Sequence, residues 1–498
     1  MSRVLVIGAG IGGLATAVRL AAAGHHVTVV EQSAHIGGKV RTYRRDGFAF
    51  DTGPSLFTLP AVYRDLFLST GTAFEENVDL QPLDPAFGIH WADGAHAVMP
   101  GVDPTHCATA LGDALGGQAS DDWRRLMARA ADMWRITREP FLQSPLPDWR
   151  TLLRLARRPA DVRTVAPFTT LRQLGRQYLA DPRLITLLDR YATYSGSDPR
   201  KAPAVFATVP YIEQTFGAWH LGGGMGTLAD ALHRRCLDLG VEVRTSCDVV
   251  RITMRDGRAS GVELADGTPL AADIVVANAD AGTVYGQLLG EDARATGIAR
   301  RIDRHPPSVA GFVILLALRG TTPGIEHHNV WFPPAYDEEF DAIFGPEPRP
   351  VDDPTIYACV PSDTTMRPDA DHEAWFILVN APRQGVHERG AVDWTAPGVA
   401  DAYADTILRR LAERGVDIRD RVLWRELRTP VDYARDARAP HGVIYGASSN
   451  GPRAAFQRPD NRSPIPGLYL VGGSAHPGGG LPLVGMGAEI TANLIGRA

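Results

Sequence analysis

A glycine-rich loop near the N-terminus constrains this chain more than any other feature. An apolar, strand-like run leads into glycines at positions 8, 10 and 13, an alanine-rich helical pattern follows, and a second apolar run ends on Glu31. Gly8 permits a tight turn, Gly10 lets a pyrophosphate approach the backbone, and Gly13 lets the helix pack closely on the strand. This order of strand, loop, helix, strand and acid predicts a dinucleotide-binding unit in which Glu31 accepts hydrogen bonds from ribose hydroxyls.

A second group of turn residues favours a ligand that is longer than one nucleotide. Gly38 is the second of two adjacent glycines, and Lys39 directly after it can neutralise a pyrophosphate as a point charge. A strand-like run then ends in the turn Gly53, Pro54 and Ser55. Taken alone, such a turn can be an ordinary loop. Beside the glycine pair, it favours FAD over NAD as the nucleotide.

Several stretches of the chain together resemble motifs of the flavin amine oxidase superfamily. They are the N-terminal unit and residues 37–39, 50–55, 222–232, 272–280 and 468–482. Within the superfamily, the chain resembles the bacterial carotenoid desaturases of the phytoene desaturase type. The segments 327–333 and 473–480 are at least as similar to the later-acting 3,4-desaturases of hydroxycarotenoids. Lys39 departs from the arginine that is usual in the superfamily, which keeps the charge but loses the bidentate geometry.

This resemblance implies an α/β fold with two lobes, and a chain of 498 residues is indeed too long for a single core. The first lobe is Rossmann-like, binds FAD and is built from three separate segments, 1–70, 225–290 and 465–498. The second lobe binds substrate and comprises residues 71–224 and 291–464. We expect it to contain a mixed sheet and a helical cap, over about 121–191, that faces a membrane.

The resemblance also implies further contacts to FAD. The backbone of Val249 meets the adenine end, and the C-terminal strand ends at the cofactor in Gly472 and Gly473. A terminal helix then directs its N-terminal N–H groups at the flavin ring, which becomes negative on reduction. We expect the start of this helix to comprise Leu483, Val484, Gly485 and Met486.

The implied activity is that of a FAD-dependent oxidoreductase, a carotenoid desaturase. It introduces C=C bonds into a long isoprenoid polyene, either phytoene or a later, hydroxylated carotenoid, by hydride transfer to flavin N5. By motif, His476 is the histidine best placed near the flavin ring, where it either accepts the proton or shapes the pocket. Arg190, Tyr191 and Tyr194 either line a polyene tunnel or pack in the core.

Other activities of the same fold stay open at this stage. One is isomerisation of a carotenoid by reduced flavin, or its binding by a carrier that holds flavin structurally. Another is oxidation of an amine or a porphyrinogen, although the tail offers no aromatic pair for an amine-binding cage, because Tyr469 lies within a strand-like run. Anaerobic mixing with a polyene separates desaturation from isomerisation, because bleaching of bound flavin requires net hydride transfer.

Composition narrows the range of partners. The net charge of −6 provides no basic field to hold nucleic acid. The four cysteines are widely spaced without a C-x-x-C pair, so we expect free thiols and no metal site. The longest apolar run, residues 309–318, is shorter than the ~18 residues of a membrane span. The oligomeric state is left open.

The segment 149–158 predicts contact with a membrane surface. Trp149 and several leucines are interleaved there with four arginines. Such a basic amphipathic helix suits anionic lipid headgroups, and a solvent-exposed surface helix is the alternative. We therefore expect a cytoplasmic protein that associates peripherally with the inner face of the cell membrane.

Overall fold

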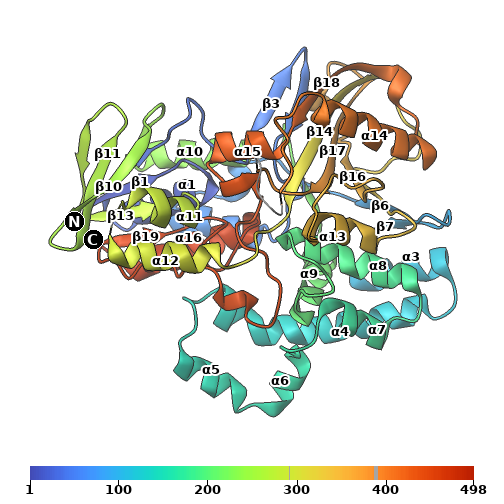
Figure 1. Ribbon diagram of the computed structural model, residues 1–498, viewed down its shortest axis with the longest axis horizontal. Coiled ribbons are helices and arrows are strands. Elements are labelled where there is room, and N and C mark those ends of the chain that lie inside the picture. Colours follow the sequence, from blue (N-terminus) through green and yellow to red (C-terminus); the bar gives the residue numbers. More distant parts are fainter. Residues whose placement is uncertain (291, 386–390) are drawn as a thin grey trace.

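The computed structural model describes residues 1–290, 292–385 and 391–498, which form two lobes and a helical cap (Figure 1). One lobe contains a parallel sheet of five strands in the order β19–β13–β1–β2–β9. Its strands are β1 (Arg3–Ile7), β2 (His26–Val30), β9 (Glu242–Arg244), β13 (Ile274–Ala277) and β19 (Leu468–Leu470). They come from three separate parts of the chain, so the discontinuous Rossmann-like lobe is confirmed, while the residue limits expected for each segment stay a prediction.

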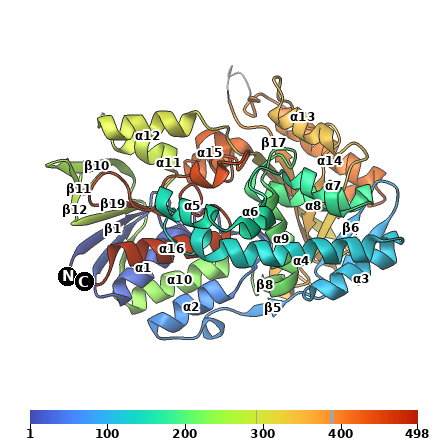
Figure 2. The same cartoon turned by 90° about the horizontal axis from the view of Figure 1, so that it is seen from below.

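Both faces of this sheet are buried, because successive side chains of a strand point to opposite faces. Val4 and Val6 of β1 pack against three helices that lie side by side (Figure 2), whereas Leu5 and Ile7 pack against a small antiparallel sheet and two further helices. The elements on the first face are α1 (Ile11–Ala22), α10 (Gly226–Asp238) and α16 (Leu481–Ile495), and those on the second are β10 (Val249–Arg255), β11 (Arg258–Leu264), β12 (Pro269–Ala271), α11 (Ala281–Thr283) and α12 (Ala293–Asp303). Packing on both faces of the sheet thus fixes the positions of the loops that follow β1 and β2.

One strand pairing differs from the expected pattern. The sequence predicts that strands over 241–244 and 248–252 both pair with a strand over 259–264, and only the second of these pairings forms. Instead, β9 pairs in parallel with β2, with Glu242 opposite Thr28, while β11 pairs with β10 across the expected tight turn. Helix α10, which precedes β9, packs against α1 on one face of the sheet, so the chain reaches the sheet edge parallel to β2.

The second lobe is built on a mixed sheet of seven strands, in the order β18–β14–β17–β16–β15–β6–β7. β15 and β6 are parallel and the other neighbours are antiparallel, so the expected mixed sheet is confirmed. Tyr403, Ile407 and Leu411 of a long helix, α14, pack against buried strand residues such as Phe312. The elements are β6 (Phe87–His90), β7 (His96–Met99), β14 (Ala310–Arg319), β15 (His328–Trp331), β16 (Ile356–Cys359), β17 (His372–Ala381), β18 (Val422–Arg428) and α14 (Val399–Glu413).

A helical cap packs around Trp123 and other buried side chains, and its α5 and α6 project at the lower edge of the molecule (Figure 1). Its helices are α3 (Pro104–Leu115), α4 (Ala119–Thr137), α5 (Trp149–Ala156), α6 (Pro159–Val165), α7 (Leu171–Tyr178), α8 (Pro182–Arg190) and α9 (Thr208–Phe216). The segment predicted as one helix to residue 158 ends at Ala156, because Pro159 starts a new helix. Within the described residues, no helix combines the length and apolar character that a membrane span requires.

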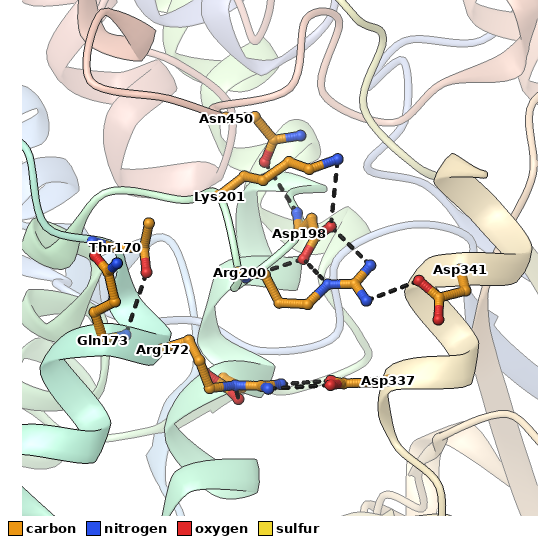
Figure 3. A network of polar contacts seen from close by, with 10 residues as sticks. Thr170, Arg172, Gln173, Asp198, Arg200, Lys201, Asp337, Asp341 and Asn450 are labelled. Carbon is orange, nitrogen blue, oxygen red and sulfur yellow. Dashed lines mark hydrogen bonds and ion pairs between the residues drawn. The ribbon is translucent and has the colours of Figure 1, made fainter. Parts of the chain in front are cut away.

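Ion pairs join this cap to α13 (Asp337–Phe344), a helix of the second lobe (Figure 3). Arg172 on α7 places Nη2 2.6 Å from Oδ1 of Asp337. Arg200 bridges two carboxylates: its Nε lies 2.9 Å from Oδ1 of the buried Asp198, and its Nη1 lies 2.7 Å from Oδ1 of Asp341. Further elements of the structure are α2 (Ala61–Thr70), α15 (Pro430–Ala437), β3 (Thr42–Arg45), β4 (Phe48–Asp51), β5 (Leu80–Pro82) and β8 (Trp219–Leu221).

Candidate active site

One large cavity lies between the two lobes and the cap. Its volume is about 1010 Å³, which reaches the upper end of the ~300–1,000 Å³ found for single small-molecule sites. Its walls include the loop after β1, the sheet of the second lobe and the cap, represented by Gly10, Phe376 and Leu152 respectively. The cavity is therefore large enough to hold a nucleotide together with part of a second ligand.

The N-terminal end of α1 opens onto this cavity. Gly10 and Gly12 line the cavity, and among the described residues no side chain caps the helix and no acid lies in its first turn. Gly8 has a φ of +93° and donates a hydrogen bond of 2.7 Å to the carbonyl of Val30, and a β-carbon on Gly13 would lie 2.1 Å from the carbonyl oxygen of Gly8. The tight loop thus presents free N–H groups and the positive end of the helix dipole, as a phosphate requires.

Glu31 stands at the end of β2, also on the cavity wall. Its Oε2 accepts a hydrogen bond of 2.7 Å from the backbone N–H of Ala9, and its Oε1 accepts one of 2.9 Å from the N–H of Ser33. These two bonds fix the carboxylate in place. Because a carboxylate has about four lone-pair positions, it keeps the capacity to accept hydroxyl donors from a ligand.

A second helix end meets the same cavity from the C-terminal part of the chain. Gly472 and Gly473, which follow β19, line the cavity together with Leu483 and Val484 of α16. Among the described residues, no side chain caps α16 and no acid lies in its first turn. Two uncapped helix N-termini therefore converge on one cavity, an arrangement that suits a ligand with more than one anionic or electron-rich group.

Comparison with known proteins agrees with this geometry. Residues 11–332 match the family described as flavin containing amine oxidoreductase. The chain is 32% identical to 4,4'-diapolycopene oxygenase of Methylomonas sp., over 99% of this chain and 98% of that relative. It is 33% identical to hydroxyneurosporene desaturase of Rubrivivax gelatinosus, over 99% of this chain and 93% of that relative. The chain belongs to the family of flavin-containing amine oxidoreductases. Its fold is similar to that of a putrescine oxidase solved with putrescine, with a TM-score of 0.65 at 14% identity and 99% coverage of both chains.

Membership of the flavin amine oxidoreductase family confirms FAD as the cofactor. The cavity fits FAD, because it joins a glycine loop at an open helix end, an acid after the second strand and a second open helix end. Gly8, Gly10 and Glu31 would hold the adenosine and pyrophosphate part, with Val249 at the start of β10 on the same wall. Gly472 would lie near the flavin ring.

The loops around Gly38 and Gly53 meet at the FAD-binding wall. Gly38, Lys39, Gly53, Pro54 and Ser55 all line the cavity. The Nζ of Lys39 donates a hydrogen bond of 2.7 Å to the carbonyl of Ile444, and burial lowers the pKa of Lys39 while the nearby Asp280 opposes that effect. In this structure the ammonium is thus held by protein groups, and its predicted contact with the pyrophosphate stays a prediction.

Three predicted cofactor contacts of this flavin oxidoreductase do not line the cavity. Gly13 lies beneath the loop, where its role is the close packing of helix on strand. Helix α16 begins at Leu481, with Pro482 in its first turn, two residues earlier than expected. Gly485 and Met486 consequently fall in the second turn, where they pack against α2 and the cap instead of facing the cavity.

His476, the predicted proton acceptor or pocket residue, is buried and borders the cavity. Its Nε2 lies 2.9 Å from the carbonyl oxygen of Ser144. Because a carbonyl only accepts hydrogen bonds, Nε2 carries the proton and Nδ1 is the basic nitrogen of the neutral ring. Burial lowers the pKa of His476, which favours this neutral form.

The structure adds residues that sequence patterns did not identify. Asn278, after β13, donates from Nδ2 to the carbonyl of Gly8 at 3.2 Å and so supports the glycine loop. The buried Arg458 donates from Nη1 to the carbonyls of Tyr445 and Gly473, both at 2.7 Å, and supports the loop near the flavin. Asn278 lies within the motif 272–280, which was a usable signal, whereas no sequence pattern surrounds Arg458.

Arg190, Tyr191 and Tyr194 belong to a buried polar cluster at the cavity wall. The Nη1 of Arg190 donates to the hydroxyl of Tyr194 at 2.9 Å. The hydroxyls of Tyr191 and Tyr194 donate to the two carboxylate oxygens of Glu213, at 2.7 and 3.1 Å. Arg190, Tyr194 and Glu213 line the cavity, so two of the three singled-out residues face the substrate space and Tyr191 packs behind them. Glu213 was missed because it lies on a different helix, α9.

A potential ligand group for a metal also lies near this cluster, although the sequence predicts no metal site. His327, His328 and Cys359 each place one ligand atom within 4.8 Å of the others. Burial lowers the pKa of both histidines and raises that of the Cys359 thiol, which favours uncharged side chains. The Nδ1 of His328 is 2.8 Å from the hydroxyl of Tyr357, so this histidine is already part of a hydrogen-bond network.

Proposed function

We propose that this chain is a FAD-dependent carotenoid desaturase. The observation that carries this proposal is one continuous cavity, which extends from the FAD loops at Gly10 and Gly472 past the second lobe to Leu152 and Phe168 of the cap. A long apolar molecule is the ligand that such a cavity suits. The full-length similarity to hydroxyneurosporene desaturase supports the same substrate class.

The chemistry needs little from the protein beyond positioning. When bound, FAD supplies the acceptor for a hydride, at flavin N5. The chain's own residues hold the polyene in register and keep water away, and the wall formed largely by the cap is accordingly apolar. Its members include Leu59, Trp134, Leu142, Phe206, Val209 and Ile212.

A desaturation also releases one proton from the polyene. His476 is our candidate to receive it at Nδ1, since Nε2 is occupied by the carbonyl of Ser144 and the ring is held neutral by burial. A neutral imidazole next to an apolar ligand is a sufficient base, because an allylic cation gives up a proton readily.

Anaerobic mixing of the FAD-loaded protein with hydroxyneurosporene tests this function. We expect bleaching of the bound flavin together with a pigment that absorbs at longer wavelength, because each new C=C bond extends the conjugated system. Isomerisation without bleaching would overturn the proposal in favour of a carotenoid isomerase. Bleaching by putrescine and not by the polyene would favour amine oxidation instead.

We further propose that α5 and α6 bring the cavity to a membrane surface. Trp149 and Phe168 are 65% and 85% exposed, while Leu152 and Leu155 of the same segment line the cavity. A polyene leaving a bilayer at this rim would enter the cavity without crossing water. The arginines of α5 and its C-terminus suit anionic lipid headgroups at the same surface.

A further inference from the structure

Arg190 is a buried cation in the polar cluster at the cavity wall. It ends α8, is 6% exposed and borders the cavity. Burying a cation is costly unless hydrogen bonds and opposite charge compensate it. A packing role alone would be filled better by an apolar side chain, so the charge itself needs an explanation.

The hydrogen bonds of Arg190 leave donors available. A guanidinium has five N–H donors. Among the residues that the structure describes, its hydrogen bond is the one from Nη1 to the hydroxyl of Tyr194. The rings of Tyr191, Tyr194 and Tyr357 surround the guanidinium, with centroids 5.9, 5.0 and 5.6 Å from Cζ. Aromatic faces stabilise the positive charge but do not satisfy N–H groups as an oxygen does.

An acceptor stands beside these donors. The hydroxyl of Tyr194 links Arg190 to Glu213, since it accepts from the guanidinium at 2.9 Å and donates to Oε2 at 3.1 Å. Glu213 is 5% exposed and also borders the cavity. The cluster thus offers a strong donor and a carboxylate acceptor at one place, which matches a hydroxyl group, because a hydroxyl both donates and accepts.

The cluster is connected through Tyr357 to the loop at the FAD-binding wall. The hydroxyl of Tyr357, whose ring packs on Arg190, is 2.7 Å from Oγ of Ser55. Ser55 follows Gly53 in the loop that rests on the backbone of Lys39 at the FAD-binding wall. An oxygen atom bound by Arg190 would therefore place the carbons next to it close to the flavin.

We propose that Arg190, with Glu213 as its partner, binds a hydroxyl group that the polyene carries a few carbons from the bond to be desaturated. This inference rests on the proposed function and narrows it, because it selects hydroxylated polyenes over their hydrocarbon counterparts. A site built to hydrogen-bond a hydroxyl rejects an analogue that lacks it, since the buried polar groups then lose their partner.

Anaerobic flavin reduction with two substrates tests the inference. The FAD-loaded protein is mixed with hydroxyneurosporene or with neurosporene, which differ in the hydroxyl. We expect kcat/KM for the hydroxylated polyene to be higher by ~10- to 100-fold, the value of one hydrogen bond to a charged group. Equal values would overturn the role of Arg190 while leaving the proposed function intact. Failure of both polyenes to reduce the flavin would overturn the proposed function itself.

Variants separate hydroxyl binding from a merely structural role. Arg190→Met should abolish the preference, because it should raise KM for the hydroxylated polyene much more than KM for neurosporene. Tyr194→Phe removes one hydroxyl and keeps the ring, so it should lower the preference by ~3- to 10-fold even if Arg190→Met fails to fold. Arg176→Met, at an exposed position of α7, is the matched control. An equal loss of activity on both polyenes would identify a structural role and overturn the inference.

Discussion

A β-carbon on Gly53 would lie 2.2 Å from the carbonyl oxygen of Lys39. The turn at Gly53 therefore rests directly on the backbone of the neighbouring loop, and both loops line the FAD-binding wall. We predict that Gly53→Ala separates the two loops and weakens FAD binding by ~5- to 100-fold, the effect of about 1–3 kcal/mol of overpacking. The FAD-to-protein ratio after purification and the Kd of the apoprotein for FAD measure this.

Gly297→Ala provides a matched control for this prediction. Gly297 lies in α12, and no atom lies within 4 Å of the position of its β-carbon. This variant should retain FAD as the wild type does. If Gly53→Ala binds FAD equally well, the contact between the two loops does not shape the cofactor site.

Replacing the buried Asp51 with Asn should stabilise the protein, and the gain should depend on pH. Asp51 is buried, its Oδ1 accepts a hydrogen bond of 2.7 Å from the backbone N–H of Met225, and burial raises its pKa to about 7. Because the folded state holds the proton more tightly than the unfolded chain, the protonated acid stabilises the fold at low pH, and this contribution is lost as the pH rises through about 7. Asp51→Asn keeps a hydrogen-bond acceptor but carries no charge at any pH. The Tm of this variant minus the Tm of the wild type should therefore increase between about pH 4 and pH 7 and then stay constant. A Tm difference that does not change with pH would contradict this.

Removing the charge of Asp198 should destabilise the junction between the cap and the second lobe. The carboxylate of Asp198 is fully buried and accepts hydrogen bonds from the backbone N–H, Nε and Nη2 of Arg200 at 2.9, 2.9 and 3.0 Å. Asp198→Asn removes the charge and should cost about 1.5–3 kcal/mol, seen as a lower Tm. Asp341→Asn, whose side chain is 65% exposed, should change stability by less than about 1 kcal/mol. Similar Tm values for the two variants would show that burial of Asp198 adds nothing.

Replacing His476 should lower kcat without changing the affinity for FAD. In His476→Gln the amide can still donate to the carbonyl of Ser144, but the basic nitrogen is lost. If Nδ1 receives the proton, kcat falls by ~10²- to 10⁴-fold while FAD binding is unchanged. Because burial lowers the pKa of His476, wild-type kcat should stay constant down to pH values below the usual range for histidine and fall only when the ring becomes protonated. An unchanged kcat in the variant would leave His476 a role in shaping the pocket alone.

The rim formed by α5 predicts salt-dependent binding to anionic vesicles. Changing Arg154, Arg157 and Arg158 to Glu should lower the partition coefficient by ~100-fold or more, since each basic residue near such a surface contributes about 1 kcal/mol. Flotation with vesicles that contain anionic phospholipid measures this. The same change at Arg255 of β10, Arg300 of α12 and Arg304 directly after α12, all exposed, should leave flotation unaltered. Equal flotation of the first variant and the wild type would mean that α5 is an ordinary surface helix.

Much of the FAD lobe was predictable because its signals are local. The glycines from Gly8 to Gly13 and the acid at Glu31 lie within one βαβ unit, so their spacing indicates a dinucleotide-binding fold. The preference for FAD over NAD rests on the later loops at Gly38 and Gly53 and on the family resemblance. The start of α16 was misplaced by two residues because the predicted pattern began with Leu483, whereas Pro482 already belongs to the first turn. The wrong pairing of β9 has a different origin, since neighbouring strands in sequence favour a hairpin unless a packed helix carries the chain elsewhere.

Sequence patterns identified only part of the polar cluster of the cavity. Arg190 and Tyr194 are close in sequence, but Glu213 comes from α9 and Tyr357 from a strand of the second lobe. No spacing rule connects these positions, because they meet only when the cap closes over the mixed sheet. The proposed substrate-binding cluster thus depends on tertiary packing, whereas the first part of the cofactor site lies within one short segment.

The order in which the lobes are completed has a consequence for synthesis of the protein. The parallel sheet obtains its last strand, β19, and α1 obtains its partner helix α16, from the final part of the chain. During translation, the edge of β13 and an apolar face of α1 stay uncovered until residues 468–495 have left the ribosome, a state that is prone to aggregation. Truncated or stalled chains should therefore accumulate as insoluble, colourless protein, and folding aids that act on nascent chains should raise the yield of the flavin-loaded form.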